Sequence, residues 1–178
     1  MRKEQYKDFD ATELEDVIPQ FHHLPGRMAL LKQAAELDSQ HRLALCRHWV
    51  DYALSQQALL DELAEISPKL PLRICHNDTK INNMLFDKRD MSSMAIIDLD
   101  TCMKGHLMYD FGDMVRTFCS PEEEDSTALD KVQVRQDIFA AICRGYLSEL
   151  GDVLTEDEKR SLWLGARVIC LMIGVRFL

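Results

Sequence analysis

The sequence predicts a mainly α-helical protein that contains one small antiparallel β-hairpin. Two observations lead to this class. Apolar residues recur at helical spacing over most of the chain, which is typical of amphipathic helices that share a core. Residues 72–100 depart from this pattern, because they contain short apolar runs of strand length that are separated by polar residues. At 178 residues the chain can bury one core, or one core with a helical appendage.

Apolar stripes and boundary residues predict the helices in chain order. Residues 1–20 are polar and lack periodicity, and Phe21–Gly26 is predicted to be a loop. The long stripe of the second helix is expected to lie in the core and to end at Pro68. Thr155 and Glu158 have the spacing of a capping box, which predicts that a final helix begins there and runs to the last residue. The predicted helices cover residues 27–37, 39–66, 109–118, 132–150 and 156–178.

The interval between the helices predicts three short strands. A first short strand is expected in the apolar segment Pro71–Cys75 before Asp78, and a polar loop follows it. The apolar runs Met84–Phe86 and Met94–Ile97 would then pair as an antiparallel hairpin with its turn near Lys88–Asp90. Such a hairpin would bring Asn83 and Asp98 to neighbouring strand ends, where the two side chains could share one metal ion.

Composition excludes several classes of partner. The net charge is −9 and the pI is about 5.1, so a nucleic-acid backbone is not an expected partner. No secretory signal opens the chain, and no apolar run is long enough to cross a bilayer, so we expect no membrane partner. The six cysteines contain no CxxC pair, and we interpret them as reduced, mostly buried thiols of a cytoplasmic protein.

The most informative motif is His76-x-Asp78, with Asn83 five residues after that aspartate and Asp98 fifteen residues further on. Phosphoryl transfer from ATP needs a carboxylate that accepts the proton of the substrate hydroxyl, and oxygen ligands that hold Mg²⁺ on the phosphates. Asp78 suits the first role, whereas Asn83 and Asp98 suit the second. The motif therefore predicts a phosphotransferase that uses ATP and Mg²⁺ as cofactors.

These residues resemble the aminoglycoside phosphotransferase and choline kinase branch of the protein-kinase-like fold. The segments His76–Asp87, Ile97–Thr101 and Tyr109–Arg116 are more similar still to bacterial N-acetylhexosamine 1-kinases, as are Phe21-His22 and Leu70–Arg73. The resemblance covers roughly residues 21–178. It implies a helical C-terminal lobe of this fold and a small-molecule sugar as the phosphate acceptor.

Carried over position by position, the resemblance implies a role for each motif residue. Asp78 would be the general base toward the sugar hydroxyl, and Asn83 and Asp98 would be Mg²⁺ ligands. Lys80 would lie beside the transferred phosphate or the sugar. Asp100 and Thr101 would lie at the pocket edge, near metal or sugar. His76 and Asp110 would support the catalytic loop. By resemblance only, His22 could also contact a sugar.

The chain departs from the family at both ends. It has no Gly-x-Gly-x-x-Gly motif, and residues before Phe21 are too few for the smaller lobe that covers ATP in these kinases. The last predicted helix also lacks a stop signal at Leu178. We therefore expect residues 1–20 to be a linker or a remnant of a missing N-terminal lobe. Residues 21–178 would be a C-terminal lobe that is incomplete at its end and inactive alone; a naturally short protein is the alternative.

Three functions remain open at this stage. The preferred hypothesis is a kinase that phosphorylates the anomeric hydroxyl of an N-acetylhexosamine in carbohydrate metabolism. A second keeps the fold but changes the acceptor to an aminoglycoside, choline or another small alcohol, and Glu122–Asp125 could then meet a polycation. A third is a non-catalytic binding module without the nucleotide lobe. The oligomeric state stays open.

Overall fold

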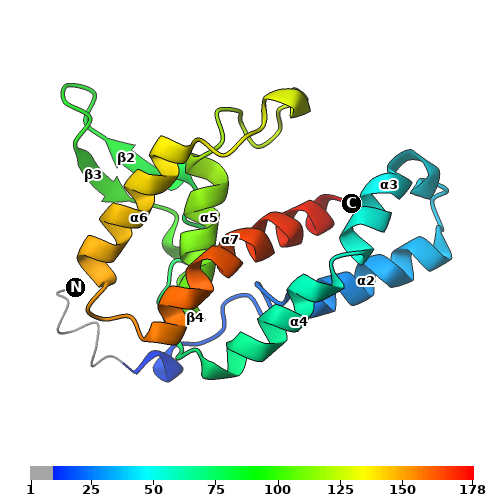
Figure 1. Cartoon of the computed structure of the whole chain (residues 1–178), viewed down its shortest axis with the longest axis horizontal. Helices are drawn as coiled ribbons and strands as arrows, with labels where there is room; N and C mark the ends of the chain where they lie inside the picture. The colour runs from blue at the N-terminus through cyan, green and yellow to red at the C-terminus, as the bar shows by residue number, and fades with distance from the viewer. Residues whose placement is uncertain (1–9) are drawn as a thin grey trace.

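The computed structural model describes residues 10–178, and its helices pack around one long central helix. In Figure 1 this helix, α7, runs through the middle of the molecule toward the C-terminus, with α5 and α6 on one side and α2–α4 on the other. None of the helices in residues 10–178 is long and apolar enough to span a lipid bilayer. The α-helices are α2 (Leu24–Leu37), α3 (Leu43–Leu54), α4 (Gln57–Ile66), α5 (Leu107–Phe118), α6 (Gln136–Leu150) and α7 (Glu156–Phe177).

Within residues 10–178, four short strands form two separate antiparallel pairs. The predicted hairpin is confirmed: β2 (Met84–Phe86) pairs with β3 (Ser93–Ile96), with Met84 opposite Ile96. The strand predicted in Pro71–Cys75 is also confirmed as β1 (Arg73–Cys75). Its partner, β4 (Met103–Gly105), was not predicted, because a three-residue strand has too little pattern to recognise in a sequence. The 3-10 turns Ile81–Asn83 and Leu99–Thr101 connect strands, and further 3-10 turns lie outside the strand region at Ala11–Glu13, Ser67–Lys69 and Leu129–Lys131.

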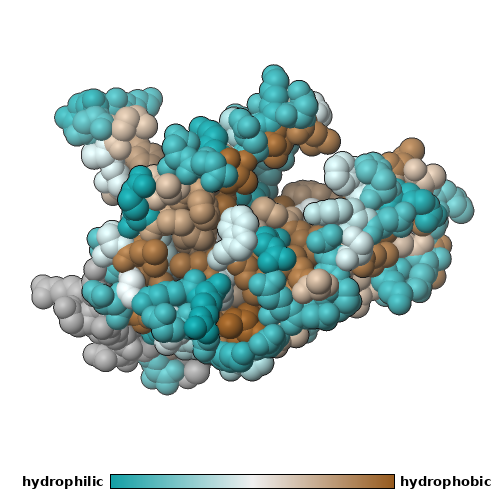
Figure 2. Space-filling model, in the orientation of Figure 1, coloured by the Kyte–Doolittle hydropathy of each residue, from teal (hydrophilic) through white to brown (hydrophobic). Residues whose placement is uncertain are grey.

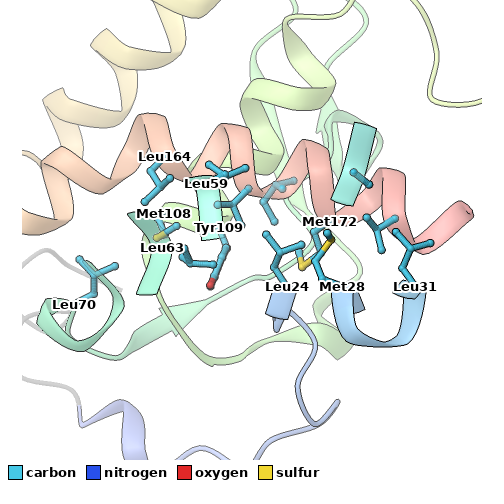
Figure 3. Packing of buried hydrophobic residues seen from close by; sticks show 14 of the residues in the cluster. Leu24, Met28, Leu31, Leu59, Leu63, Leu70, Met108, Tyr109, Leu164 and Met172 are labelled. Atoms are coloured by element: carbon cyan, nitrogen blue, oxygen red, sulfur yellow. The ribbon is translucent and has the colours of Figure 1, made fainter. Parts of the chain in front are cut away.

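Helix α7 contributes to two hydrophobic clusters on its opposite sides. The first cluster joins α7 to α2, α3 and α4, and Figure 3 shows Leu24, Met28 and Leu31 of α2 directed toward α7. The second cluster joins α7 to α5 and α6 around the fully buried Phe111. Full burial of one such side chain contributes about 1.5–3 kcal/mol to stability. The site described below lies at the end of α5 that these two clusters hold in place.

Three sequence predictions about the helices are wrong in detail. The predicted loop Phe21–Gly26 in fact contains the start of α2, where the side chain of His23 caps the backbone N–H of Gly26. The predicted helix 39–66 is two helices, because the chain breaks at Ser55, whose hydroxyl donates to the carbonyl of Tyr52. The helix predicted from residue 132 begins at Gln136. The other predicted helices agree with the structure within two residues, and Gly151 ends α6 as predicted.

The break at Ser55 also changes what the apolar stripe covers. Trp49 is 46% exposed and Leu54 is 38% exposed, so the expectation that the whole stripe is core is wrong at these positions. The thiols differ in a similar way. All six cysteines are free as expected, but only Cys75 and Cys119 are buried, so the expectation of mostly buried thiols is also wrong.

The predicted capping box opens α7 and ties it to the strand that precedes the motif. The Thr155 hydroxyl accepts from the N–H of Glu158, and the Glu158 carboxylate accepts from the N–H of Thr155. The same carboxylate, which is 3% exposed, receives two hydrogen bonds of 2.9 Å from the Arg73 guanidinium on β1. This buried, bidentate pair fixes β1 against the start of α7.

Helices α5 and α7 cross so closely that two positions must be glycine. A Cβ atom on Gly165 would overlap the carbonyl oxygen of Met108, and one on Gly112 would overlap the carbonyl oxygen of Gly165. Backbone atoms cannot move aside as a flexible side chain can. The close crossing therefore fixes the position at which α5 packs against α7.

Gly165→Ala should destabilise the protein by about 2 kcal/mol or more, because the new methyl group forces α5 and α7 apart. The control is Gly145→Ala on the exposed side of α6, where no atom lies within 4 Å of the added Cβ. That control should gain up to about 1 kcal/mol from helix propensity. Urea denaturation of both variants measures the difference, and equal stability of the two would contradict the close crossing.

Candidate active site

The motif residues lie on a loop that the buried Asp110 of α5 holds from below. One oxygen of the Asp110 carboxylate accepts from the N–H of Asn77 at 2.7 Å, and the other accepts from the N–H of His76 at 2.9 Å. The main-chain carbonyl of Asp110 also accepts from the Thr79 hydroxyl at 2.6 Å. Asp110 is 8% exposed. Its contacts are those that the expected support of the loop requires.

His76 joins the loop to the end of the hairpin. Its Nε2 lies 3.0 Å from the carbonyl oxygen of Ile97, and its Nδ1 accepts from the N–H of Asp78 at 3.3 Å. The carbonyl oxygen of His76 accepts from the Thr101 hydroxyl at 2.7 Å. Thr101 is thus engaged with the loop backbone, and its expected contact with metal or sugar stays a prediction.

Asp78 is placed between an amide and an ammonium group. Its oxygen Oδ2 accepts from Lys80 Nζ at 2.7 Å and from Asn83 Nδ2 at 2.9 Å, and Asn83 Nδ2 also donates to the Asp78 carbonyl at 2.8 Å. Charge-assisted hydrogen bonds of this length fix the orientation of a carboxylate. The other oxygen, Oδ1, takes no part in these two hydrogen bonds.

Asp98 lies beside this group at the end of β3. Its Oδ2 is 4.0 Å from Lys80 Nζ, so the ammonium lies between the carboxylates of Asp78 and Asp98. The hydrogen bond to Asp78 raises the pKa of Lys80. A side-chain hydrogen bond with Asp100 raises the pKa of Asp98, and the charge of Asp100 adds to this effect. Two carboxyl groups in contact in this way form a site that favours a cation.

The available oxygen donors fit a magnesium ion that is also bound by phosphates. Asn83 uses its amide nitrogen for Asp78, so its oxygen is the atom that would bind metal. The carbonyl of Asn83 accepts from the N–H of Ile97 at 2.9 Å, which keeps Asn83 near Asp98. Within residues 10–178 no three or more His, Cys, Asp or Glu side chains are grouped so that they could hold a metal ion. Mg²⁺ usually takes one or two protein carboxylates, with phosphate and water oxygens completing its shell.

Two further residues also hold the loop: Asn77, which the sequence did not assign to the site, and His22, for which it offered only a sugar contact by resemblance. Asn77 has a φ of 65°, a left-handed conformation that asparagine tolerates better than most residues. Its side-chain nitrogen donates to the carbonyls of Cys75 and Thr101 at 3.2 and 3.1 Å. His22, 55 residues upstream, approaches the loop with its Nε2 3.1 Å from the carbonyl oxygen of Asn77. Asn77 has a weak sequence signal, whereas nothing near His22 indicates its partner.

Burial shifts the pKa values of His22 and Asp110 in opposite directions. Desolvation lowers the pKa of His22 from 6.5 to about 4, although the hydrogen bond to Asn77 opposes the shift. Desolvation also raises the pKa of Asp110 from 3.8 to about 6, and the two backbone N–H groups that it binds oppose that shift. At neutral pH His22 is therefore uncharged and Asp110 is mainly ionised. The second state is the one that accepts both backbone hydrogen bonds.

A cavity of about 490 Å³ lies apart from these residues, between α3, α4, α5 and α7. None of the eight motif residues lines it. Figure 2 shows hydrophobic surface in the hollow between α3 and the loop after α5. Its lining is largely apolar and includes Trp49, Tyr52, Val115, Trp163 and Cys170.

The chain belongs to the phosphotransferase enzyme family (APH), whose sequence model matches residues 5–149. A similar solved structure is an aminoglycoside-3'-phosphotransferase of type VIII, with 19% sequence identity and a TM-score of 0.39. That match covers 88% of this chain and 62% of the other, so the chain spans less than two thirds of that structure's length. The mainly helical architecture with its small antiparallel hairpin is consistent with the C-terminal lobe of the kinase-like fold.

Replacing His22 by glutamine should remove part of the acid sensitivity of the fold. Unfolded histidine takes up a proton near pH 6.5, whereas folded His22 does so only near pH 4. The free energy of unfolding should therefore fall as the pH drops through this window, by about 3 kcal/mol from His22 alone. The raised pKa of Asp110 acts in the opposite direction but is common to both proteins.

The measurement is urea denaturation of the unmodified chain and of His22→Gln between about pH 4 and pH 7. The stability difference between them should change with pH in the stated direction. His48→Gln, on the exposed face of α3, is the control and should keep the pH dependence of the unmodified chain. A constant difference for His22→Gln would contradict a buried, neutral His22.

Proposed function

We propose that this chain is the acceptor-binding and catalytic part of an ATP- and Mg²⁺-dependent kinase for a small alcohol, with an N-acetylhexosamine as the preferred acceptor. The observation that carries the proposal is the geometry of Asp78. Lys80 and Asn83 both occupy its Oδ2, so Oδ1 is left as the base for an incoming hydroxyl. A base held in one orientation typically contributes 10²–10⁴-fold to a rate.

The neighbouring residues would divide the remaining tasks. Asn83 and Asp98 would hold Mg²⁺, which when bound would neutralise negative charge on the phosphates. The Lys80 ammonium, 2.7 Å from Asp78 and 4.0 Å from Asp98, would stabilise negative charge at the transferred phosphoryl group. Asp100 would assist at the metal side. These roles agree with the chemistry of each side chain and with membership of the phosphotransferase family.

The nucleotide would lie beside the hairpin, which exposes apolar side chains next to Asp98. Leu85, Met94 and Ile96 are 44%, 66% and 57% exposed, respectively. An isolated two-stranded hairpin with apolar residues at its surface favours contact with a further structural element or with a base. A second lobe of the full-length protein is the element we propose. The six free thiols favour a reducing compartment, and we propose the cytoplasm.

The choice of acceptor rests mainly on the resemblance of the motifs to N-acetylhexosamine 1-kinases. A polycationic aminoglycoside would meet the Lys80 ammonium at the reacting centre, which disfavours it. The acidic run that could favour such a ligand is partly engaged already. Glu124 accepts from Arg116 at 2.7 Å, and Glu122 accepts from the Ser126 hydroxyl at 2.6 Å.

Asp78→Asn in the full-length protein should lower kcat by about 10²-fold or more and leave the affinity for ATP nearly unchanged. The amide keeps the volume of the side chain but cannot accept the proton. Asp61→Asn on the exposed side of α4 is the matched control and should keep full activity. Steady-state kinetics with the acceptor and with ATP decide the matter, and near-normal kcat in Asp78→Asn would remove Asp78 from the mechanism.

N-acetylglucosamine or N-acetylgalactosamine should be phosphorylated with a higher kcat/KM than kanamycin, choline or glucose. A site that hydrogen-bonds an acetamido group leaves its polar groups unpaired when plain glucose binds. The panel is measured with the full-length protein and Mg-ATP. A preference for kanamycin or choline would contradict the proposed sugar acceptor but would leave the proposed kinase activity intact. No turnover of any acceptor, together with no nucleotide binding, would favour a non-catalytic binding module.

A further inference from the structure

The peptide group between Asn77 and Asp78 is held at both ends by histidine rings. Its carbonyl oxygen lies 3.1 Å from His22 Nε2, and its N–H donates to His76 Nδ1 at 3.3 Å. The Cα of Asp78 is bonded directly to this peptide, so a tilt of the peptide plane moves the carboxylate. The two rings therefore act on the backbone unit whose orientation sets where Asp78 points.

Each ring must carry its proton on Nε2 for these contacts to form. A carbonyl oxygen can only accept, so His22 must donate from Nε2 to Asn77, and His76 must donate from Nε2 to Ile97. His76 Nδ1 must then be an unprotonated acceptor for the N–H of Asp78. His22 Nδ1 is buried without a hydrogen-bond partner among residues 10–178, so a proton there would gain nothing. The surroundings thus select the neutral Nε2–H form of His22.

His22 is itself held firmly by its neighbours. Its ring lies 4.9 Å from the ring of Tyr109, which directly precedes Asp110 on α5, and 4.6 Å from the ring of Phe21. The Arg27 guanidinium donates to the carbonyl of Phe21 at 2.9 Å and so fastens the turn that carries His22. The ring is packed between the start of α2 and the helix that holds the loop.

We propose that His22 is a positioning residue for Asp78, acting through its hydrogen bond to the Asn77 carbonyl. The proposal rests on the proposed kinase function only for its effect on catalysis. Asp110, Thr101 and His76 hold the loop from the segments that follow the motif or from within it. His22 supplies the restraint from the preceding helical layer, and it acts on the peptide adjacent to the base. Displacement of a reacting group by about 1 Å can cost about 10²-fold in rate.

The first test needs no activity and uses the 178-residue chain itself. Two-bond ¹H–¹⁵N NMR spectra of histidine side chains distinguish the two neutral tautomers. We expect His22 in the Nε2–H form at neutral pH. An Nδ1–H tautomer or a freely exchanging ring would overturn the proposal, because neither donates steadily to Asn77.

The second test compares His22→Gln with His22→Leu, which both fill space but differ in the presence of a side-chain N–H donor. In the chain, amide exchange of Asp78 should be about tenfold or more faster in His22→Leu, and His22→Gln should stay within about threefold of the unmodified chain. In the full-length kinase, kcat should fall about tenfold or more in His22→Leu with an unchanged KM for ATP, and glutamine should restore most of it.

The outcomes separate the two claims. Equal losses in both variants would mean that the ring is needed for packing, and no loss in either would mean that the contact is not needed; each result overturns the proposal. If the unmodified full-length protein phosphorylates nothing, the kinase function fails, while tautomer and exchange data still decide the role of His22. If His22→Leu does not fold, the tautomer measurement and the glutamine variant decide it.

Discussion

The site depends on the hydrogen bonds that the buried carboxylate of Asp110 accepts from the backbone of the loop. The carboxylate takes the N–H groups of two consecutive residues, His76 and Asn77, on its two oxygens at 2.9 and 2.7 Å. A buried carboxylate is costly unless its oxygens are hydrogen-bonded, and backbone N–H groups in a loop are costly when left unpaired. Each partner thus satisfies the other, and the two hydrogen bonds restrain the loop that carries Asp78.

The geometry of this contact depends on the rest of the fold, which fixes the position of α5 relative to β1. The strand β1 is tied to the start of α7 by the bidentate pair of Arg73 and Glu158. Helix α7 in turn crosses α5 at Gly165, where no side chain fits between the backbones. Asp110 of α5 then contacts the loop that follows β1, so these contacts link β1, α7, α5 and the loop to one another. A shift of any of these elements would move Asp78 relative to Lys80 and Asn83.

The sequence predicted those parts of the site that are close together in the chain. The hairpin, and with it the approach of Asn83 to Asp98, followed from two apolar runs and a polar turn. The interval between Asp78 and Asn83 is short enough for one loop to bring them together. The contact of His22 with Asn77 spans 55 residues and is made to a backbone carbonyl, which has no residue type that a sequence could reveal. Strand β4 and the helix break at Ser55 were missed because tertiary packing and one hydroxyl group decide them.

Native-state hydrogen exchange of the His76 and Asn77 amides tests the central role of Asp110 most directly. If the carboxylate holds both N–H groups in a buried site, these amides should exchange only through large-scale unfolding, with protection close to that of the buried residues of α7. Because the pKa of Asp110 is raised to about 6 in the folded state, proton uptake by Asp110 below that pH should not by itself remove this protection. Exchange of both amides at the rate of an exposed loop at neutral pH would contradict the anchoring of the loop by Asp110.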